Sequence, residues 1–331
     1  MNLQYRIDLL VRLGEYILSD NEAWQEAKEK AAYENGWFIP AFTTLATKNI
    51  ANYYLQKDIL QNWAANYDLP PYQAHPKTVG IVMAGNIPLV GFHDLLCVFI
   101  AGHQAKIKTS SKDDVLIRHL VSKLAEWNAE VEAAIQYAVM LKTCDAYIAT
   151  GSNNSAGYFD YYFGKYPHII RRNRTSVALL DGNETIEDLE KLADDVYQYF
   201  GLGCRNVTKI FVPEGYDFVP LLEAFKKYDY LADHHKYKNN FDYNLAIHIL
   251  NKKYYMSRPS LLLVENESFF SPISQLNYSF YQPPFDVNIL INNPQIQAIV
   301  GKGYLPFGQS QCPAIDNYAD GVDTLAFVSR L

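Results

Sequence analysis

The sequence predicts an α/β protein, with a doubly wound parallel sheet followed by a second α/β region. From residue 78 onward, short β-rich runs alternate with helical segments, which is typical of right-handed βαβ units and a parallel sheet. Before that point, residues 1–70 repeat apolar positions at spacings of three and four, which indicates helices. At 331 residues, the chain is long enough to bury a full core and to divide into two packed regions.

The first sheet is predicted from four β-rich runs, TVGIVMA (78–84), AKIKT (105–109), AYIAT (146–150) and SVALLD (176–181). Between the first two runs, four apolar residues share one helical face, as a crossover helix packed on a sheet requires: Phe92, Leu95, Leu96 and Phe99. Gly102 follows as a helix stop signal. The turn signal LPPYQAHPK (69–77) separates this region from the N-terminal helices.

The second α/β region is predicted to start after a helix with the sequence IEDLEKLADDVYQYF (186–200). Its expected strands are VTKIFVP (207–213), SLLLVE (260–265) and VNILIN (287–292). A final strand is expected at TLAFVS (324–329), where it would pair within the sheet or with another subunit.

The composition is that of an ordinary globular protein, with 49% hydrophobic and 20% charged residues and a formal charge of −7. Such a charge gives no general affinity for polyanions, so we expect no nucleic-acid partner. The most apolar stretch, residues 87–101, contains His93 and Asp94, so no integral membrane segment is predicted. The 26 Tyr and 17 Phe either fill cores and interfaces or line an apolar tunnel for a lipid chain.

Four cysteines, at positions 97, 144, 204 and 312, lie far apart and form no C-x-x-C pair. We therefore predict free thiols and a cytoplasmic location. The adjacent His234 and His235 have no further ligands at usable spacing, so no metal site is predicted.

A series of short motifs carries the chemistry. In order, they are A-G-N-I-P (84–88) after the first strand, G-H-Q-A-K-I-K-T-S-S (102–111), A-T-G-S (149–152) after the third strand, and G-L-G-C-R-N (201–206) before a later strand. The glycines of the last motif follow a helix and lack the third glycine of the dinucleotide fingerprint, so they do not indicate that fingerprint.

The order and spacing of these motifs resemble the aldehyde dehydrogenase superfamily, from about residue 76 to residue 331. The resemblance implies Asn86 as the oxyanion donor and Cys204 as the nucleophile. It further implies Lys108, Gly151 and Ser152 as cofactor-binding residues. The implied domains are an N-terminal helical region (1–75), a nicotinamide cofactor-binding domain (76–203), a catalytic domain (204–305), and a C-terminal segment (306–331) that returns to the sheet or forms the interface of a homodimer.

One difference from the superfamily pattern indicates which group of aldehyde dehydrogenase relatives the chain resembles. Aldehyde dehydrogenases that hydrolyse their acyl-enzyme place an activating Glu before the strand that corresponds to SVALLD, whereas this chain has I-R-R-N at residues 170–173. Without that general base, a thioester on Cys204 would persist until a hydride arrives. With the loop G-L-G-C-R-N-V-T-K-I and the short chain, the sequence is most similar to the LuxC-type acyl-CoA reductases.

The family resemblance implies that Cys204 attacks an acyl-CoA or acyl-carrier thioester, and that a nicotinamide cofactor reduces the acyl-enzyme to an aldehyde. Two alternatives stay open: a Cys-dependent acyltransferase or thioesterase without cofactor, and a non-catalytic acyl-binding protein. Acyl-CoA-dependent oxidation of the cofactor would distinguish the reductase from both.

The cofactor is expected to be NADPH, with NADH as the alternative. NAD-preferring relatives often place a Glu where this chain has Ser111, which Lys112 follows, so a 2′-phosphate would meet no repulsion. Lys108 and Lys112 could instead mark a solvated strand end. The nicotinamide ribose is expected to meet Glu267 in E-S-F-F-S-P (267–272), one residue away from the position that relatives use, where Ser268 stands.

Overall fold

The structure, a computed structural model, describes residues 1–282 and 284–331 and consists of two compact units. Residues 1–173 and 313–331 form the first unit, and residues 174–312 form the second. The boundary expected between residues 203 and 204 falls inside the second unit, because β6 (Thr175–Leu179) and β7 (Val207–Pro213) pair on either side of it. The return to the first unit begins at residue 313 rather than 306.

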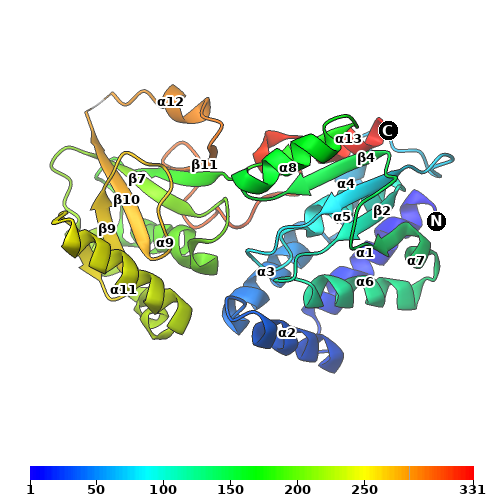
Figure 1. Ribbon diagram of the computed structural model, residues 1–331, viewed down its shortest axis with the longest axis horizontal. Helices are drawn as coiled ribbons and strands as arrows, with labels where there is room; N and C mark the ends of the chain where they lie inside the picture. Colours follow the sequence, from blue (N-terminus) through cyan, green and yellow to red (C-terminus); the bar gives the residue numbers. More distant parts are fainter. Residues whose placement is uncertain (283) are drawn as a thin grey trace. The chain divides into compact units, whose positions relative to one another are not determined.

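The first unit contains a parallel sheet of five strands in the order β3-β2-β1-β4-β5 (Figure 1). This is the doubly wound order, in which the direction of winding reverses between β1 and β4. Three of the four runs predicted for this sheet, TVGIVMA, AKIKT and AYIAT, are confirmed, whereas the fourth, SVALLD, forms a strand of the second unit's sheet. The strands β3 and β5 were not predicted. The strands are β1 (Thr78–Val82), β2 (Gln104–Lys108), β3 (Ile135–Tyr137), β4 (Ala146–Thr150) and β5 (His168–Arg171).

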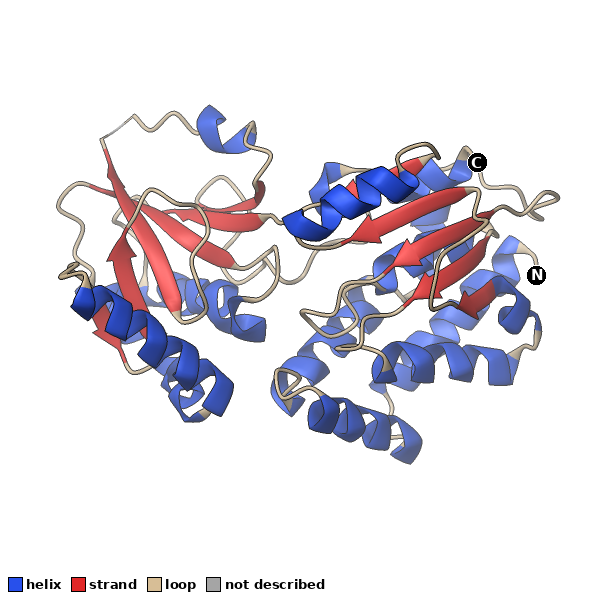
Figure 2. Ribbon diagram, in the orientation of Figure 1, coloured by secondary structure: helices blue, strands red, loops and turns tan. Residues whose placement is uncertain are grey.

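Helices cover both faces of this sheet (Figure 2). Right-handed crossovers in opposite directions place their helices on opposite faces, so α8 (Asn153–Phe163) lies opposite α5 (Phe92–Ala101) and α6 (Val115–Trp127). The predicted helices before residue 70 are confirmed and share one apolar core with α5 and the sheet. The remaining helices of this part are α1 (Leu3–Leu18), α2 (Glu22–Glu34), α3 (Pro40–Tyr53), α4 (Lys57–Ala65) and α7 (Glu130–Ala134).

The predicted final strand is wrong, because these residues form helix α13 (Thr324–Ser329) after a short 3-10 turn at Ala319–Gly321. The Asp323 carboxylate accepts a hydrogen bond from the Ala326 N–H at 2.8 Å, which caps the first turn of the helix. Leu325 and Val328 are buried, and the helix packs on α5. The return segment 313–331 therefore completes the core of the first unit and adds no strand to a sheet.

The second unit contains a six-stranded sheet in the order β11-β6-β7-β10-β9-β8, in which β8 (Met256–Arg258) at the edge is antiparallel and the other pairings are parallel. The remaining strands are β9 (Leu261–Glu265), β10 (Gln275–Tyr281) and β11 (Ile296–Gly301). The helical segments are α9 (Ile186–Tyr197), α10 (Val219–Ala224), α11 (His235–Leu250) and α12 (Asn288–Ile291), with 3-10 turns at Gln198–Gly201 and Phe225–Asp233.

One predicted strand of the second unit is also wrong. The run VNILIN becomes the short helix α12, where the Asp286 carboxylate accepts from the Asn288 N–H at 3.1 Å. A short apolar run is compatible with either a strand or a helical turn, and here the Asp side chain at its start favours the turn. The predicted strands VTKIFVP and SLLLVE are confirmed as β7 and β9, and the run SVALLD, predicted for the first sheet, forms β6 of this one.

Candidate active site

The turn after β1 carries Asn86 at the carboxyl end of the strand, and its backbone is tightly held. A Cβ atom on Gly85 would lie 2.5 Å from the Ser110 Oγ, so only glycine allows this close approach to the loop after β2. Leu89 adopts a left-handed conformation with φ of 58°, and its N–H donates to the Asp113 carboxylate at 2.6 Å. Asn86 is exposed on this fixed turn.

Asp113 is the buried residue that supports the Asn86 turn, and no motif in the sequence indicates it. Only one of its carboxylate oxygens has a hydrogen-bond partner among the described residues, the Leu89 N–H. Burial raises the pKa of Asp113 to about 7, because the ionised carboxylate loses its solvation.

Lys108 and Ser111 lie at the carboxyl end of the neighbouring strand β2. Lys108 is the last residue of β2 and pairs in register with Val82 of β1. The side chains of Lys108 and Ser111 are both exposed, as groups that contact a ligand must be before it binds.

Gly151 and Ser152 follow β4, on the other side of β1. A Cβ atom on Gly151 would lie 2.9 Å from the Phe159 ring, so the backbone approaches α8 closely here. The Ser152 Oγ accepts from the Ser155 N–H at 3.3 Å and caps α8. The N-terminal N–H groups of such a helix favour negatively charged ligands.

The five site residues predicted in the first unit thus lie at or just after the carboxyl ends of three adjacent strands: Asn86, Lys108, Ser111, Gly151 and Ser152. This edge includes the point between β1 and β4 where the strand order reverses, and open α/β sheets bind nucleotides outside the carboxyl ends of strands at such a point. The exposed Lys108, the side-chain-free Gly151 and the α8 N-terminus fit a dinucleotide.

Cys204 belongs to the second unit, in the loop between α9 and β7. The residue is half-buried, and its carbonyl oxygen accepts from the Ser176 Oγ at 3.2 Å. The loop is preceded by three successive residues with left-handed backbones, Tyr199, Phe200 and Gly201, with φ of 54°, 58° and 74°. Left-handed conformations cost non-glycine residues about 1–2 kcal/mol each, and such strain persists only where the surroundings impose it.

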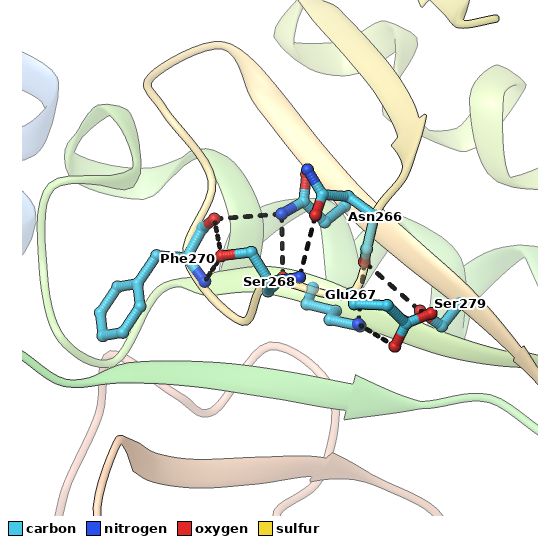
Figure 3. Close-up of polar contacts among 7 residues, drawn as sticks. Asn266, Glu267, Ser268, Phe270 and Ser279 are labelled. Atoms are coloured by element: carbon cyan, nitrogen blue, oxygen red, sulfur yellow. Dashed lines mark hydrogen bonds and ion pairs between the residues drawn. The ribbon is translucent and has the colours of Figure 1, made fainter. Parts of the chain in front are cut away.

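Glu267 lies after β9, in a segment that folds back along the sheet (Figure 3). Thr208, near the start of β7, donates to the Phe269 carbonyl at 2.6 Å, and the Asn277 amide donates to the carbonyls of Ser268 and Phe270 at 2.9 and 3.0 Å. The Glu267 carboxylate is almost fully exposed and accepts from the Ser279 Oγ at 3.3 Å.

Lys209 of β7, which belongs to no motif of the sequence, supports this segment through its side chain. Its side chain is 1% exposed, and its ammonium donates to the Asn266 carbonyl at 2.9 Å and lies 3.8 Å from the Glu267 carboxylate. Burial lowers the pKa of Lys209, and the negative charge of Glu267 opposes that shift. The Lys inside VTKIFVP was the one sequence signal for this contact, because a charged side chain in a buried strand needs a polar partner.

Residues 170–173, where the resemblance places the activating Glu of hydrolytic aldehyde dehydrogenases, provide no carboxylate. Arg171 at the end of β5 is buried and forms an ion pair with Asp94 of α5 at 2.6 Å. Its guanidinium also donates to the Thr324 hydroxyl of α13 at 2.7 Å. The Asn173 N–H donates to the Asn153 side chain at 3.1 Å.

Within residues 1–282 and 284–331, no group of three or more His, Cys, Asp or Glu side chains is arranged to hold a metal ion. Among the helices in the same described part of the chain, none combines the length and apolar character needed to cross a membrane.

Two sequence comparisons bear on this chain. A family model described as acyl-CoA reductase (LuxC) matches residues 47–221. A long-chain acyl-protein thioester reductase from Aliivibrio fischeri is 24% identical over 301 residues, which cover 84% of this chain and 61% of that protein. The chain thus spans less than two thirds of the length of this relative.

Solved structures resemble the fold at low sequence identity. An NAD-dependent aldehyde dehydrogenase from Sinorhizobium meliloti gives a TM-score of 0.68 at 11% identity, covering 91% of this chain and 70% of that one. Aldehyde dehydrogenase C from Pseudomonas syringae, in complex with NAD+ and octanal, gives a TM-score of 0.62 at 12% identity. The match covers 85% of this chain and 68% of that one. At these identities the likeness shows the fold, which is that of aldehyde dehydrogenases.

Proposed function

The chain belongs to the acyl-CoA reductase (LuxC) family, and from this we propose that it reduces an acyl thioester to an aldehyde with a nicotinamide cofactor. Two features together support the proposal. Cys204 is half-buried on a constrained loop, and residues 170–173 contain no carboxylate. Arg171 there points into the core, to Asp94, so this position offers no base to activate water.

The reaction begins with attack of the Cys204 thiolate on the thioester carbonyl. The bond between the acyl carbon and the carrier sulfur breaks, and the carrier leaves as a thiol after taking up a proton. The Asn86 amide and the Cys204 N–H are proposed to donate to the oxyanion, each worth about 2.7–4 kcal/mol. The acyl group is then held on the Cys204 sulfur.

When bound, a reduced nicotinamide would supply a hydride to the carbonyl carbon of the acyl group on Cys204. The Cys204 residue then leaves as a thiolate when its bond to the acyl carbon breaks, which releases the aldehyde and restores the nucleophile. Overall, one thioester, one reduced nicotinamide and one proton give one aldehyde, one thiol and one oxidised nicotinamide.

The residues proposed to hold the cofactor are those at the carboxyl edge of the first sheet, Lys108, Ser111, Gly151 and Ser152, together with Glu267. We propose NADPH rather than NADH, because Lys108 and Ser111 are exposed at the end of β2 and put no carboxylate against a 2′-phosphate. A long-chain acyl group is proposed from the name of the Aliivibrio fischeri relative. Its carrier is coenzyme A or a protein.

The test is incubation with acyl-CoAs of graded chain length and each nicotinamide cofactor, measuring nicotinamide absorbance, free CoA and aldehyde. The reductase requires that all three change together. Release of CoA without oxidation of the cofactor would favour an acyltransferase or thioesterase, and no CoA release at all would favour an acyl-binding protein. Radiolabelled acyl groups should attach to the wild-type protein and not to Cys204→Ala.

A further inference from the structure

We propose that the buried side chain of Asn206 is a positioning residue, which holds the loop of Cys204 in the geometry that acyl transfer needs. The inference rests on the proposed nucleophilic role of Cys204 and identifies what orients that residue. Asn206 lies two residues after Cys204, immediately before β7, and is fully buried.

The Asn206 amide connects the end of α9 to the Cys204 loop. Its Oδ1 accepts from the Gly203 N–H at 2.8 Å. Its Nδ2 donates toward the carbonyls of Asp195, Val196 and Gln198, at 3.1, 3.3 and 2.8 Å. These carbonyls belong to the last turn of α9 and the residue after it, where helix geometry leaves acceptors without intrahelical partners.

The Asn206 side chain forms hydrogen bonds on both sides of the left-handed turn, through Nδ2 before the turn and through Oδ1 after it. Gln198 precedes the turn at residues 199–201, and Gly203 follows it. The side chains of Tyr199 and Phe200 are buried, and the Phe200 ring lies 4.6 Å from that of His234. The backbone alone does not favour three successive left-handed residues, so a bridge between the ends of the turn is what stabilises it.

The other side of the loop is fixed by β6. The Ser176 Oγ donates to the Cys204 carbonyl at 3.2 Å, and the Ser176 N–H donates to the Asn206 carbonyl at 3.0 Å. Cys204 is therefore fixed at its own carbonyl and through Gly203, the residue before it. Asn206 controls the Gly203 side, and hence the direction of the Cys204 N–H and Sγ.

The test compares Asn206→Ala and Asn206→Asp with a control, Asn244→Ala. Asn244 is also buried in the second unit, where its amide donates to the Ile273 carbonyl at 3.0 Å. The first readout is the single-turnover rate of acyl transfer from acyl-CoA to Cys204. The second is site-resolved alkylation by iodoacetamide, as the ratio of the rates at Cys204 and at the half-buried Cys312.

We expect Asn206→Ala to slow acyl transfer at least about tenfold and to change the alkylation ratio by a similar factor, because small displacements of a reacting group are costly. The control should stay within about twofold of the wild type for both readouts. In Asn206→Asp, the ionised carboxylate would face carbonyl oxygens, so its acyl-transfer rate should fall relative to wild type as the pH rises.

A folded Asn206→Ala that keeps both rates within about twofold of wild type would overturn the proposal. If Asn206→Ala does not fold, Asn206→Asp decides, and a pH profile that overlaps the wild type would overturn it. Failure of the proposed function is distinguishable, because a wild-type protein that forms no acyl-Cys204 refutes acyl transfer, whereas the alkylation ratio still reports on the loop.

Discussion

At the residue scale, Asp113 shows how the turn that carries Asn86 depends on a buried neighbour. Its carboxylate accepts from the Leu89 N–H and so stabilises the left-handed residue that ends the Asn86 turn. Since burial raises the pKa of Asp113 to about 7, the folded protein binds this proton more strongly than the unfolded chain, where an Asp pKa is about 3.9. The stability that this group contributes is present below about pH 4 and is lost as the pH rises through about 7.

We therefore predict that Asp113→Asn reduces the loss of stability between about pH 5 and about pH 8. Relative to wild type, the variant should gain roughly 1–3 kcal/mol in unfolding free energy over this interval, because it has no carboxyl proton to lose. Urea unfolding at both pH values measures the effect. Asp160→Asn is the control, since that carboxylate pairs with Arg172 at the surface and away from Asp113. Equal effects of Asp113→Asn at both pH values would contradict the prediction.

A substitution at Ser111 tests the proposed preference for NADPH over NADH. Ser111→Glu places a negative charge at the exposed end of β2, where the 2′-phosphate of NADPH is proposed to lie. We expect the KM for NADPH to rise at least about tenfold while the KM for NADH changes little, because only NADPH carries that phosphate. Ser111→Gln is the matched neutral control in steady-state kinetics. A parallel rise in both KM values would place the phosphate elsewhere.

At the scale of elements, β5, α5 and α13 meet at one buried ion pair. Arg171 and Asp94 are each less than a tenth exposed, and Arg171 also donates to Thr324. Such a pair adds little net stability compared with apolar residues, but removal of one partner leaves a buried charge.

Asp94→Ala is accordingly expected to destabilise the protein by about 3–5 kcal/mol. The control is Asp160→Ala, which breaks the exposed pair with the adjacent Arg172 and should cost at most about 1 kcal/mol. Chemical denaturation of the wild type and the two variants measures both losses of unfolding free energy. Similar losses in the two variants would show that the Arg171 charge is accommodated in another way.

The elements also show what sequence patterns can determine. The runs at 78–84, 105–109, 146–150 and 207–213 were predicted correctly because each is β-rich and bounded by turn signals. TLAFVS and VNILIN were assigned as strands on apolar content alone, although Asp323 and Asp286 before them are helix-start signals. The strands β3 and β8 are too short to produce a pattern.

For the candidate site, the sequence yielded the residues that belong to motifs. The structure gathers five of them at one sheet edge, while their proposed roles, like those of Cys204 and Glu267, stay predictions. The sequence assigned no role to Asp113, or to Asn206 within G-L-G-C-R-N, because their partners are backbone groups, which any residue type can provide. Lys209 was missed although a Lys inside an apolar strand indicates a buried charge. A side chain that bonds to the backbone of another segment leaves no pattern in a single sequence.

At the scale of the whole molecule, the second unit is one continuous stretch of chain with its own sheet and apolar clusters. We predict that residues 174–312 fold when expressed alone, because the sheet needs no strand from outside this range. Circular dichroism and amide hydrogen exchange would measure the folding of this fragment, with a fragment of residues 1–173 as the comparison. An unfolded 174–312 fragment would show that the unit depends on the rest of the chain.

The return segment 313–331 has a consequence for synthesis. Domains commonly fold from the N-terminus as the chain emerges from the ribosome. Here the first unit lacks α13 until after the second unit has been translated, so the apolar side of α5 that receives Leu325 and Val328 remains uncovered in the meantime. The second unit can therefore reach its native state first, and the nascent first unit offers chaperones an apolar surface until its last helix arrives.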